Sequence, residues 1–411
     1  MTKVVVIGGG AAGFFAAINA AELAIKNGKP AEVQILEASN LILKKVRISG
    51  GGRCNVTHNL FDIRAFCERY PRGSKELNSP FHSFQAQDTV QWFKNRGVNL
   101  VAEEDGRMFP ETNTSETIIE CFLDSAKKSN VEIKLNHKVE SVTKIDQGQF
   151  LIQIRNLEPI RADKVMIATG SSAFGYQLAE GLGHSLTEMA PSLFSFKITD
   201  PLISELPGLS FENVEVKLLI ENEKPFKERG PLLITHWGLS GPAVLKISAW
   251  AAREMLHSNY QGILKVNWTG FERIDAVIEV LKKLKDEGQK SQIQNIYPEF
   301  LAKRFWLKIL EKSNIPLEKR WADVSNKELQ SLSESLFSTE LKIQGKNRYK
   351  DEFVECGGVA LNEINFKKME SKICPGLYFA GEVLDIDGIT GGFNFQNAWT
   401  GAWIAANSMV S

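Results

Sequence analysis

The sequence has no excess charge of either sign, because 49 Lys and Arg residues balance 49 Asp and Glu residues among 411 positions. Such a chain has no overall attraction to nucleic acid or to anionic lipid. It also lacks a long apolar run: the best candidate, Phe14 to Ile25, is interrupted by Asn19 and Glu22 and falls short of the ~20 apolar residues of a transmembrane helix. We therefore expect neither a nucleic-acid partner nor a membrane anchor.

Cysteine is scarce, with five residues and no Cys-x-x-Cys pair. Wide spacing in a chain of this length is typical of a reducing compartment rather than of a disulfide framework. The first strand-like run begins at Val4, which leaves no room for a secretory leader. The sequence therefore predicts a cytoplasmic protein.

The six histidines have no spacing typical of a metal cage, since no two of them stand at His-x-His or His-x-x-x-His spacing. No metal site is predicted. The composition is otherwise ordinary for a globular protein, with 43% hydrophobic and 24% charged residues. The length predicts about two or three domains.

A glycine-rich turn connects the first predicted strand to the first predicted helix. Lys3–Ile7 is β-branched and apolar, Phe14–Lys26 is Ala-rich, and Val33–Glu37 is a second strand-like run. Between the first two lies Gly8-Gly-Gly10-Ala-Ala12-Gly13, which matches G-x-G-x-x-G. A lone match is weak evidence, but this one stands inside a strand, turn, helix, strand order. That context predicts a dinucleotide-binding βαβ unit.

Each residue of the motif has a physical role. Gly8 allows the tight turn, Gly10 lets the backbone approach a pyrophosphate, and Gly13 permits close packing of helix on strand. The start of the helix, which includes Ala12, offers amide donors and a positive dipole end to the phosphates. Glu37 stands 24 residues after Gly13, near the usual spacing of ~20, and can accept hydrogen bonds from ribose hydroxyls.

The rest of the chain changes character several times. The segment 44–55 contains Gly50, Gly51 and Gly52 and is predicted to be a loop. Pro-punctuated strand runs such as 215–220 begin near residue 190, and charged helical periodicity occupies 271–341. The remaining periodicity predicts helices at 86–96, 115–129 and 397–407, and strands at 131–135, 139–145, 150–155 and 164–168.

Two further segments resemble landmarks of glutathione-reductase-type FAD domains. The first is the strand that ends in Ala168-Thr169-Gly170, and the second is the run that ends in Ala380-Gly381-Glu382. In that superfamily an Asp at the last position binds the ribityl chain, and Glu382 replaces it here. Val139 stands where such folds read the adenine through backbone groups; the alternative is an ordinary core position.

Longer motifs resemble the BaiN-like family of bacterial FAD-dependent oxidoreductases, which includes flavoproteins described as aminoacetone oxidases and bile-acid reductases. They are Ile48–Thr57, Gly106–Pro110, Thr235–Pro242, Cys356–Val359 and Ala380–Asn394. The resemblance implies an α/β fold in which an inserted β-rich domain, itself carrying a helical insertion, interrupts a Rossmann-type FAD-binding domain. The expected bounds are 1–189 with 355–411 for FAD binding, 190–270 with 342–354 for the β-rich domain, and 271–341 for the helices.

Other candidate residues have two interpretations each. Arg53 either neutralises the FAD pyrophosphate or is a surface charge. Cys54 either approaches the flavin or is a small buried apolar residue. His236 either transfers a proton on the substrate side or is structural. A last group either contacts the flavin, mainly through backbone amides before a helix that begins near Gln396, or only stabilises a turn: Asp387, Gly388, Gly391, Gly392 and Asn394.

The sequence is compatible with two directions of electron transfer between the flavin and the substrate. FAD accepts and donates hydride at N5, and the sequence has neither a second G-x-G-x-x-G after a strand nor a Cys-x-x-Cys, so a dedicated NAD(P)H domain is not predicted. The enzyme either reduces an unsaturated small molecule with a transient NAD(P)H donor or oxidises an amine with oxygen. The alternative is a non-catalytic FAD-binding or RNA-associated flavoprotein. Oligomeric state is not predicted.

Overall fold

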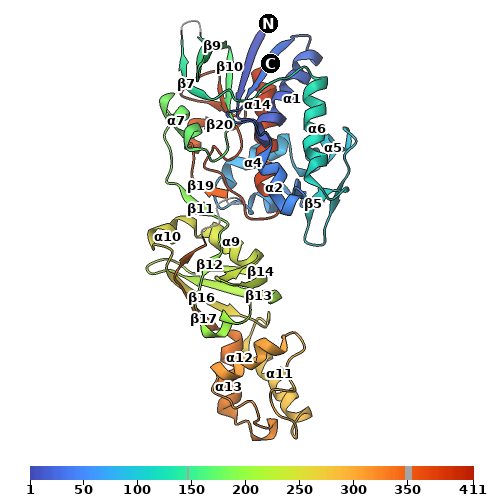
Figure 1. Ribbon diagram of the computed structural model, residues 1–411, viewed down its shortest axis with the longest axis vertical. Coiled ribbons are helices and arrows are strands. Elements are labelled where there is room, and N and C mark those ends of the chain that lie inside the picture. Colours follow the sequence, from blue (N-terminus) through green and yellow to red (C-terminus); the bar gives the residue numbers. More distant parts are fainter. Residues whose placement is uncertain (146–147, 348–353) are drawn as a thin grey trace. The chain divides into compact units, whose positions relative to one another are not determined.

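The computed structural model describes residues 1–145, 148–347 and 354–411 (Figure 1). The chain divides into two units, residues 1–190 with 351–411 and residues 191–350. The return from the second unit to the first falls among 348–353, outside the described residues, as does part of the predicted segment 342–354. The finer division into three domains stays a prediction.

A mainly parallel sheet organises the first unit. Its order is β20-β21-β22-β10-β1-β2-β6, and the contacts among β22, β10, β1, β2 and β6 are all parallel. Both ends of the chain therefore supply strands to one sheet, in which β10 lies between β22 and β1. The bounds are β1 Thr2–Ile7, β2 Ala31–Leu36, β6 Glu132–Lys134, β10 Lys164–Ile167, β20 Ile364–Asn365, β21 Glu370–Ser371 and β22 Leu377–Phe379.

Helices α1 (Ala11–Lys26) and α14 (Phe393–Met409) pack against each other on this sheet, with α6 (Ser115–Lys128) beside α1 (Figure 1). Their contact is aromatic: Phe15 of α1 lies 5.3 Å from Trp399 of α14 between ring centroids, and both side chains are fully buried. Rings of this size bury much apolar area. The core of the first unit therefore joins residues from the two ends of the chain.

Smaller elements complete the first unit. An antiparallel sheet of β7, β8 and β9 contacts β1, and β3, β5 and β4 form another antiparallel sheet. Their bounds, with those of the remaining helices, are β3 Thr57–His58, β4 Leu100–Ala102, β5 Arg107–Pro110, β7 Val139–Lys144, β8 Phe150–Ile154, β9 Leu157–Ala162, α2 Lys44–Gly52, α3 Ile63–Cys67, α4 Ser74–Ser83, α5 Ala86–Lys94, α7 Ala173–Gly181 and η3 Leu361–Glu363.

The predicted loop at 44–55 is wrong in its first half. Helix α2 begins at Lys44, and only from Ser49 to Gly51 does the backbone leave helical geometry. The first residues of the segment include Lys and Arg, which are good helix formers, whereas Gly50 and Gly51 take positive φ angles of 57° and 69°. The glycines therefore end the helix and do not prevent it.

The second unit is built on an antiparallel sheet in the order β17-β16-β13-β14-β15-β12-β18. Helix α9 packs on β13 and β14. The bounds are β12 Phe196–Lys197, β13 Ser210–Leu219, β14 Phe226–Thr235, β15 Gly238–Ser240, β16 Gly262–Asn267, β17 Thr339–Ile343, β18 Gly345–Lys346, α8 Pro201–Ser204, α9 Pro242–Trp250 and α10 Ala252–His257. In the sequence, β11 Ala190–Ser192 precedes these elements and β19 Val354–Cys356 follows them.

A helical group lies between β16 and β17. It consists of α11 Ile274–Glu287, α12 Lys303–Lys312, η2 Trp321–Asp323 and α13 Asn326–Phe337. Its attachment to the sheet includes Trp268, whose Nε1 donates to Thr339 Oγ1 at 2.8 Å and whose ring lies 4.8 Å from that of Phe305. Strand β17 begins at Thr339, so the last three residues of the predicted helical stretch 271–341 lie in a strand.

These sheets and helices confirm the α/β class. No helix in the described ranges is long and apolar enough to cross a bilayer.

A buried histidine ties distant parts of the first unit together. The His184 ring lies 2.9 Å from Glu363 Oε2 through Nδ1 and 2.8 Å from Ser371 Oγ through Nε2, and its side chain is fully buried. Burial lowers the pKa of His184, although the contact with Glu363 acts in the opposite direction. The neutral ring is therefore the form that stabilises this network.

We expect the free energy of unfolding to fall as the pH drops below about 6.5, the usual pKa of an unfolded histidine. The unfolded chain then binds a proton that folded His184 resists, and protons destabilise the fold. Replacement of His184 by Gln removes this titration and should flatten the slope. It should also cost about 1–3 kcal/mol at neutral pH, because a buried hydrogen-bond network is disturbed. Denaturant unfolding at several pH values checks both effects; equal slopes in the two proteins would contradict the assignment.

Candidate functional site

The glycine-rich turn brings the start of α1 close to the end of β1. Gly8 has a φ of +112°, and a Cβ on it would lie 2.5 Å from the Ala168 carbonyl oxygen. A Cβ on Gly13 would lie 2.0 Å from the Gly8 carbonyl oxygen, closer than two such atoms can approach. Both positions therefore require glycine for steric reasons, as the motif predicts.

Glu37 holds the turn from the neighbouring strand end. Its Oε2 accepts from the Gly9 amide at 2.9 Å, and its Oε1 accepts from the Ser39 amide and hydroxyl at 2.9 and 2.8 Å. This second role, in shaping the turn itself, was not predicted from sequence. The contact of Glu37 with a ribose stays a prediction.

The other predicted landmarks gather at the same carboxyl edge of the sheet. A Cβ on Gly381 would lie 3.3 Å from Ala12 Cβ, and one on Gly170 would lie 3.8 Å from Glu382 Oε2. The ends of β1, β10 and β22 therefore bring their motifs together, and ligands of open α/β sheets bind at this edge.

Sequence reasoning missed Lys45, which lies in the first turn of α2. Its Nζ pairs with Glu382 Oε2 and lies 3.2 Å from Ser171 Oγ. The Lys45 side chain is about half exposed and that of Glu382 is mostly buried, at 51% and 15%. The pair places a positive charge beside Glu382, and the contact of Glu382 with the ribityl chain stays a prediction.

FAD fits this edge. A Cβ on Gly10 would meet no atom within 4 Å among the described residues, and no side chain there caps the start of α1. Backbone amides and open space therefore coincide where a pyrophosphate is expected. Two buried polar groups, Thr169 Oγ1 and the side-chain amide of Asn397, also have no hydrogen-bond partner within the described part of the chain. Buried polar groups normally have partners, and a polar ligand would supply them.

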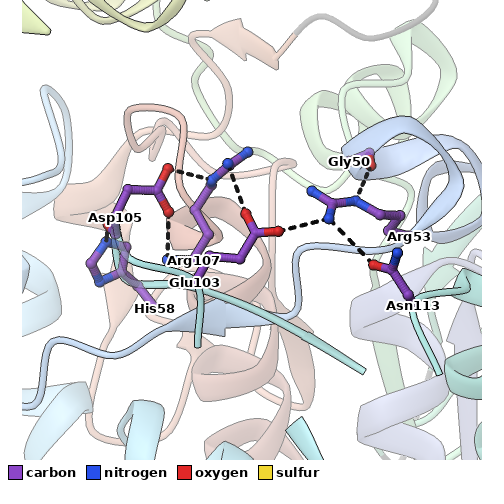
Figure 2. Close-up of polar contacts among 7 residues, drawn as sticks. All are labelled: Gly50, Arg53, His58, Glu103, Asp105, Arg107 and Asn113. Atoms are coloured by element: carbon purple, nitrogen blue, oxygen red, sulfur yellow. Dashed lines mark hydrogen bonds and ion pairs between the residues drawn. The ribbon is translucent and has the colours of Figure 1, made fainter. Parts of the chain in front are cut away.

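Arg53 belongs to a chain of polar contacts within the first unit (Figure 2). Its Nη1 donates to Glu103 Oε1 at 2.7 Å, and Glu103 Oε2 accepts from Arg107 Nη2 at 2.8 Å. Arg107 also donates through Nε to Asp105 Oδ2, and the Asp105 carbonyl oxygen lies 3.1 Å from His58 Nε2. Glu103 is thus shared between Arg53 and Arg107. The expected contact of Arg53 with the pyrophosphate stays a prediction.

The Cys54 thiol has the environment of a packing residue. It is fully buried, and burial raises its pKa to about 12, against a weaker opposing hydrogen bond with Ser49. A thiol must ionise to react as a nucleophile. The geometry therefore favours the interpretation of Cys54 as a small buried residue over a redox role.

The turn before α14 is fastened by its own side chains. The fully buried carboxylate of Asp387 pairs with both nitrogens of the Arg72 fork, and Asn394 Oδ1 accepts from the Gly388 amide at 2.8 Å while its Nδ2 donates to the Gly388 carbonyl at 2.9 Å. The amide of Gly388 is thus already engaged. Helix α14 begins at Phe393, not near Gln396, so Asn394 lies in its first turn.

The remaining candidates are placed as follows. Gly391 and Gly392 have positive φ angles of 134° and 90°, and Gly392 precedes α14. Val139 is buried at the start of β7, opposite Ile154. His236 is exposed in the turn between β14 and β15 of the second unit, and its role stays a prediction. No three His, Cys, Asp or Glu side chains gather as metal ligands in the described ranges.

Comparison with known proteins identifies the family of this chain. The family model for the HI0933-like protein Rossmann domain matches residues 2–408. The chain belongs to this family. The resemblance to the BaiN-like FAD-dependent oxidoreductases is thereby confirmed, and with it the enzyme class.

Individual proteins are similar over the whole length. A ribosomal RNA dihydrouridine synthase of Escherichia coli K12 is 31% identical, over 99% of this chain and 98% of the relative. A 3-dehydro-bile acid delta(4,6)-reductase of Clostridium scindens is 26% identical, over 99% of both. The crystal structure of a 3-ketosteroid delta1-dehydrogenase from Sterolibacterium denitrificans shares the fold, with a TM-score of 0.53 at 10% identity and full coverage of both chains.

Replacement of Gly10 by Val should remove FAD without unfolding the chain. The new side chain points into open space within the protein but occupies the place expected for the pyrophosphate. The variant should purify colourless, with a wild-type circular dichroism spectrum. Gly13→Ala is the matched control: its Cβ collides with the Gly8 carbonyl, so it should lose folded protein. A yellow Gly10→Val protein would refute the phosphate site.

Replacement of Glu37 by Ala should weaken FAD binding more than FMN binding, because FMN has no adenosine ribose for the carboxylate to contact. Glu37→Gln keeps an oxygen for the Gly9 amide and separates the role in the turn from the role toward ribose. Fluorescence titration of both flavins checks the difference. Equal losses for FAD and FMN would show that Glu37 acts only on the turn.

Proposed function

We propose that this oxidoreductase uses FAD to reduce a carbon–carbon double bond conjugated to a carbonyl group. The observation that supports this direction is shared by two relatives that match over at least 98% of their length. One is named a ribosomal RNA dihydrouridine synthase and the other a 3-dehydro-bile acid delta(4,6)-reductase. In uridine the C5–C6 double bond is conjugated to a ring carbonyl, and in dihydrouridine this bond is saturated. Both names therefore describe the same bond chemistry on different substrates.

The residues of the carboxyl edge have defined tasks in this proposal. The amides at the start of α1, with the open space at Gly10, hold the pyrophosphate, and Glu37 holds the adenosine ribose. Glu382 with Lys45 holds the ribityl chain, and the partnerless amide of Asn397 supplies further hydrogen bonds. FAD, when bound, supplies hydride transfer. The protein's part is to bind and orient it and to exclude water.

A nicotinamide nucleotide is the proposed electron donor. The sequence has no second dinucleotide motif after a strand, so the donor and the substrate would use the flavin in turn. Oxidation of an amine by oxygen is the competing direction, and neither relative's name supports it.

A uridine in ribosomal RNA is the first substrate to test, because the relative with 31% identity acts on ribosomal RNA by name. This departs from the expectation of no nucleic-acid partner, which rests on a balance of charge over the whole chain and says nothing of local surfaces. Binding through phosphates weakens steeply with salt, so RNA affinity at two salt concentrations separates this substrate from a small ketone.

The test is an anaerobic visible spectrum of the yellow protein. NADH or NADPH should bleach the flavin band, and unmodified ribosomal RNA transcript or a steroid 4-ene-3-ketone should restore it without air. The Gly10→Val protein is the control for reactions that need no bound flavin. A flavin that stays oxidised with both nicotinamides, yet is bleached by an amine, would replace the reductase proposal by the oxidase direction.

A further inference from the structure

Tyr176 in α7 has a buried hydroxyl that no described residue satisfies. The side chain is only 6% exposed, and its oxygen has no hydrogen-bond partner in the described part of the chain. A buried hydroxyl without a partner costs free energy that phenylalanine would avoid. Packing alone therefore gives no reason for tyrosine at this position.

The hydroxyl belongs to the carboxyl edge of the parallel sheet. Gly175, its neighbour in sequence, packs on Thr169: a Cβ there would lie 1.8 Å from Thr169 Oγ1, the other hydroxyl of this edge without a partner. Glu382 and Asp385, which follow β22, and Glu355 in β19 act on the Tyr176 hydroxyl electrostatically. Tyr176 therefore lies near Thr169 and near Glu382, which the proposed function places beside the flavin half of FAD.

The environment keeps the hydroxyl protonated. Burial raises the pKa of Tyr176 well above its usual value, and the negative charges of Glu355, Glu382 and Asp385 raise it further. A group in this state gives a proton to a carbanion-like carbon but does not act as a base near neutral pH. The carboxylates of Glu382 and Asp387 at the same edge are already bound to Lys45 and Arg72.

We propose that the Tyr176 hydroxyl is the proton donor in the reduction, an inference that rests on the proposed function. Saturation of a conjugated double bond breaks its π bond and forms two C–H bonds. The hydride and its electron pair come from the reduced flavin, which a nicotinamide nucleotide has reduced, and go to the carbon β to the carbonyl. The proton goes from Tyr176 to the α carbon, and the tyrosinate takes a proton back from water.

The test compares Tyr176→Phe with the wild-type holoprotein. The variant should keep or slightly raise its melting temperature, because phenylalanine removes a buried hydroxyl without a partner in the described part of the chain. It should also keep its FAD affinity and its rate of flavin reduction by the nicotinamide. Anaerobic reoxidation by the unsaturated substrate should fall by about 100-fold or more, the usual contribution of an acid catalyst. The wild-type rate of that step should fall in D2O, and the residual rate of the variant should lose this isotope effect.

Tyr70→Phe is the matched structural control, because Tyr70 is also buried but its hydroxyl donates to the Phe393 carbonyl at 2.6 Å. Its loss should lower the melting temperature by about 2–4 °C. A similar fall in Tyr176→Phe would overturn the proposal in favour of a structural hydroxyl, a loss of FAD affinity would make it a cofactor contact, and unchanged reoxidation would remove it from catalysis. Failure of the proposed function itself is visible separately, as wild-type reduced flavin that no unsaturated substrate reoxidises.

Discussion

The close approach of helix α1 to strand β1 is the contact on which the first unit depends. A single methyl group on Gly13 would lie 2.0 Å from the Gly8 carbonyl oxygen, so any other residue forces the helix away from the strand. With the helix in place, its amides lie at the carboxyl edge beside Glu37, and Ala12 lies against Gly381. The same approach sets α1 against α14. Cofactor geometry and core packing therefore share one steric requirement.

Local pattern was enough to predict the elements around this contact. The β1, α1 and β2 order at residues 3–37 is confirmed with ends within a few residues, because strand and helix periodicities differ clearly there. Shorter elements were missed: α3 spans Ile63–Cys67 and β3 only Thr57–His58. A segment of two to five residues is too short to show a helical or a strand periodicity of apolar residues. Such segments acquire their structure from tertiary contacts.

The candidate site likewise contains residues that could be predicted from local sequence and residues that could not. The glycines and Glu37 follow from a motif whose members are near one another in sequence, and the structure brings them to one edge. Their side-chain partners could not be predicted in this way. Arg72 meets Asp387 across 315 positions and Lys45 meets Glu382 across 337, and an isolated Arg or Lys gives no signal of such a partner. Tyr176 likewise shows its importance only through a hydroxyl that burial leaves without a bond.

The position of β22 and α14 has a consequence for biosynthesis. Strand β10 has no neighbour on one side until β22 is synthesised. Phe15 likewise has no ring contact with Trp399 until α14 is synthesised. At ~5–20 residues per second, roughly 20 to 80 seconds pass between these two rings leaving the ribosome. During that time the apolar face of α1 and an open strand edge are exposed to other chains. The second unit, made in between, can complete its own sheet first. The nascent first unit is therefore the part of this protein with the greatest need of a chaperone.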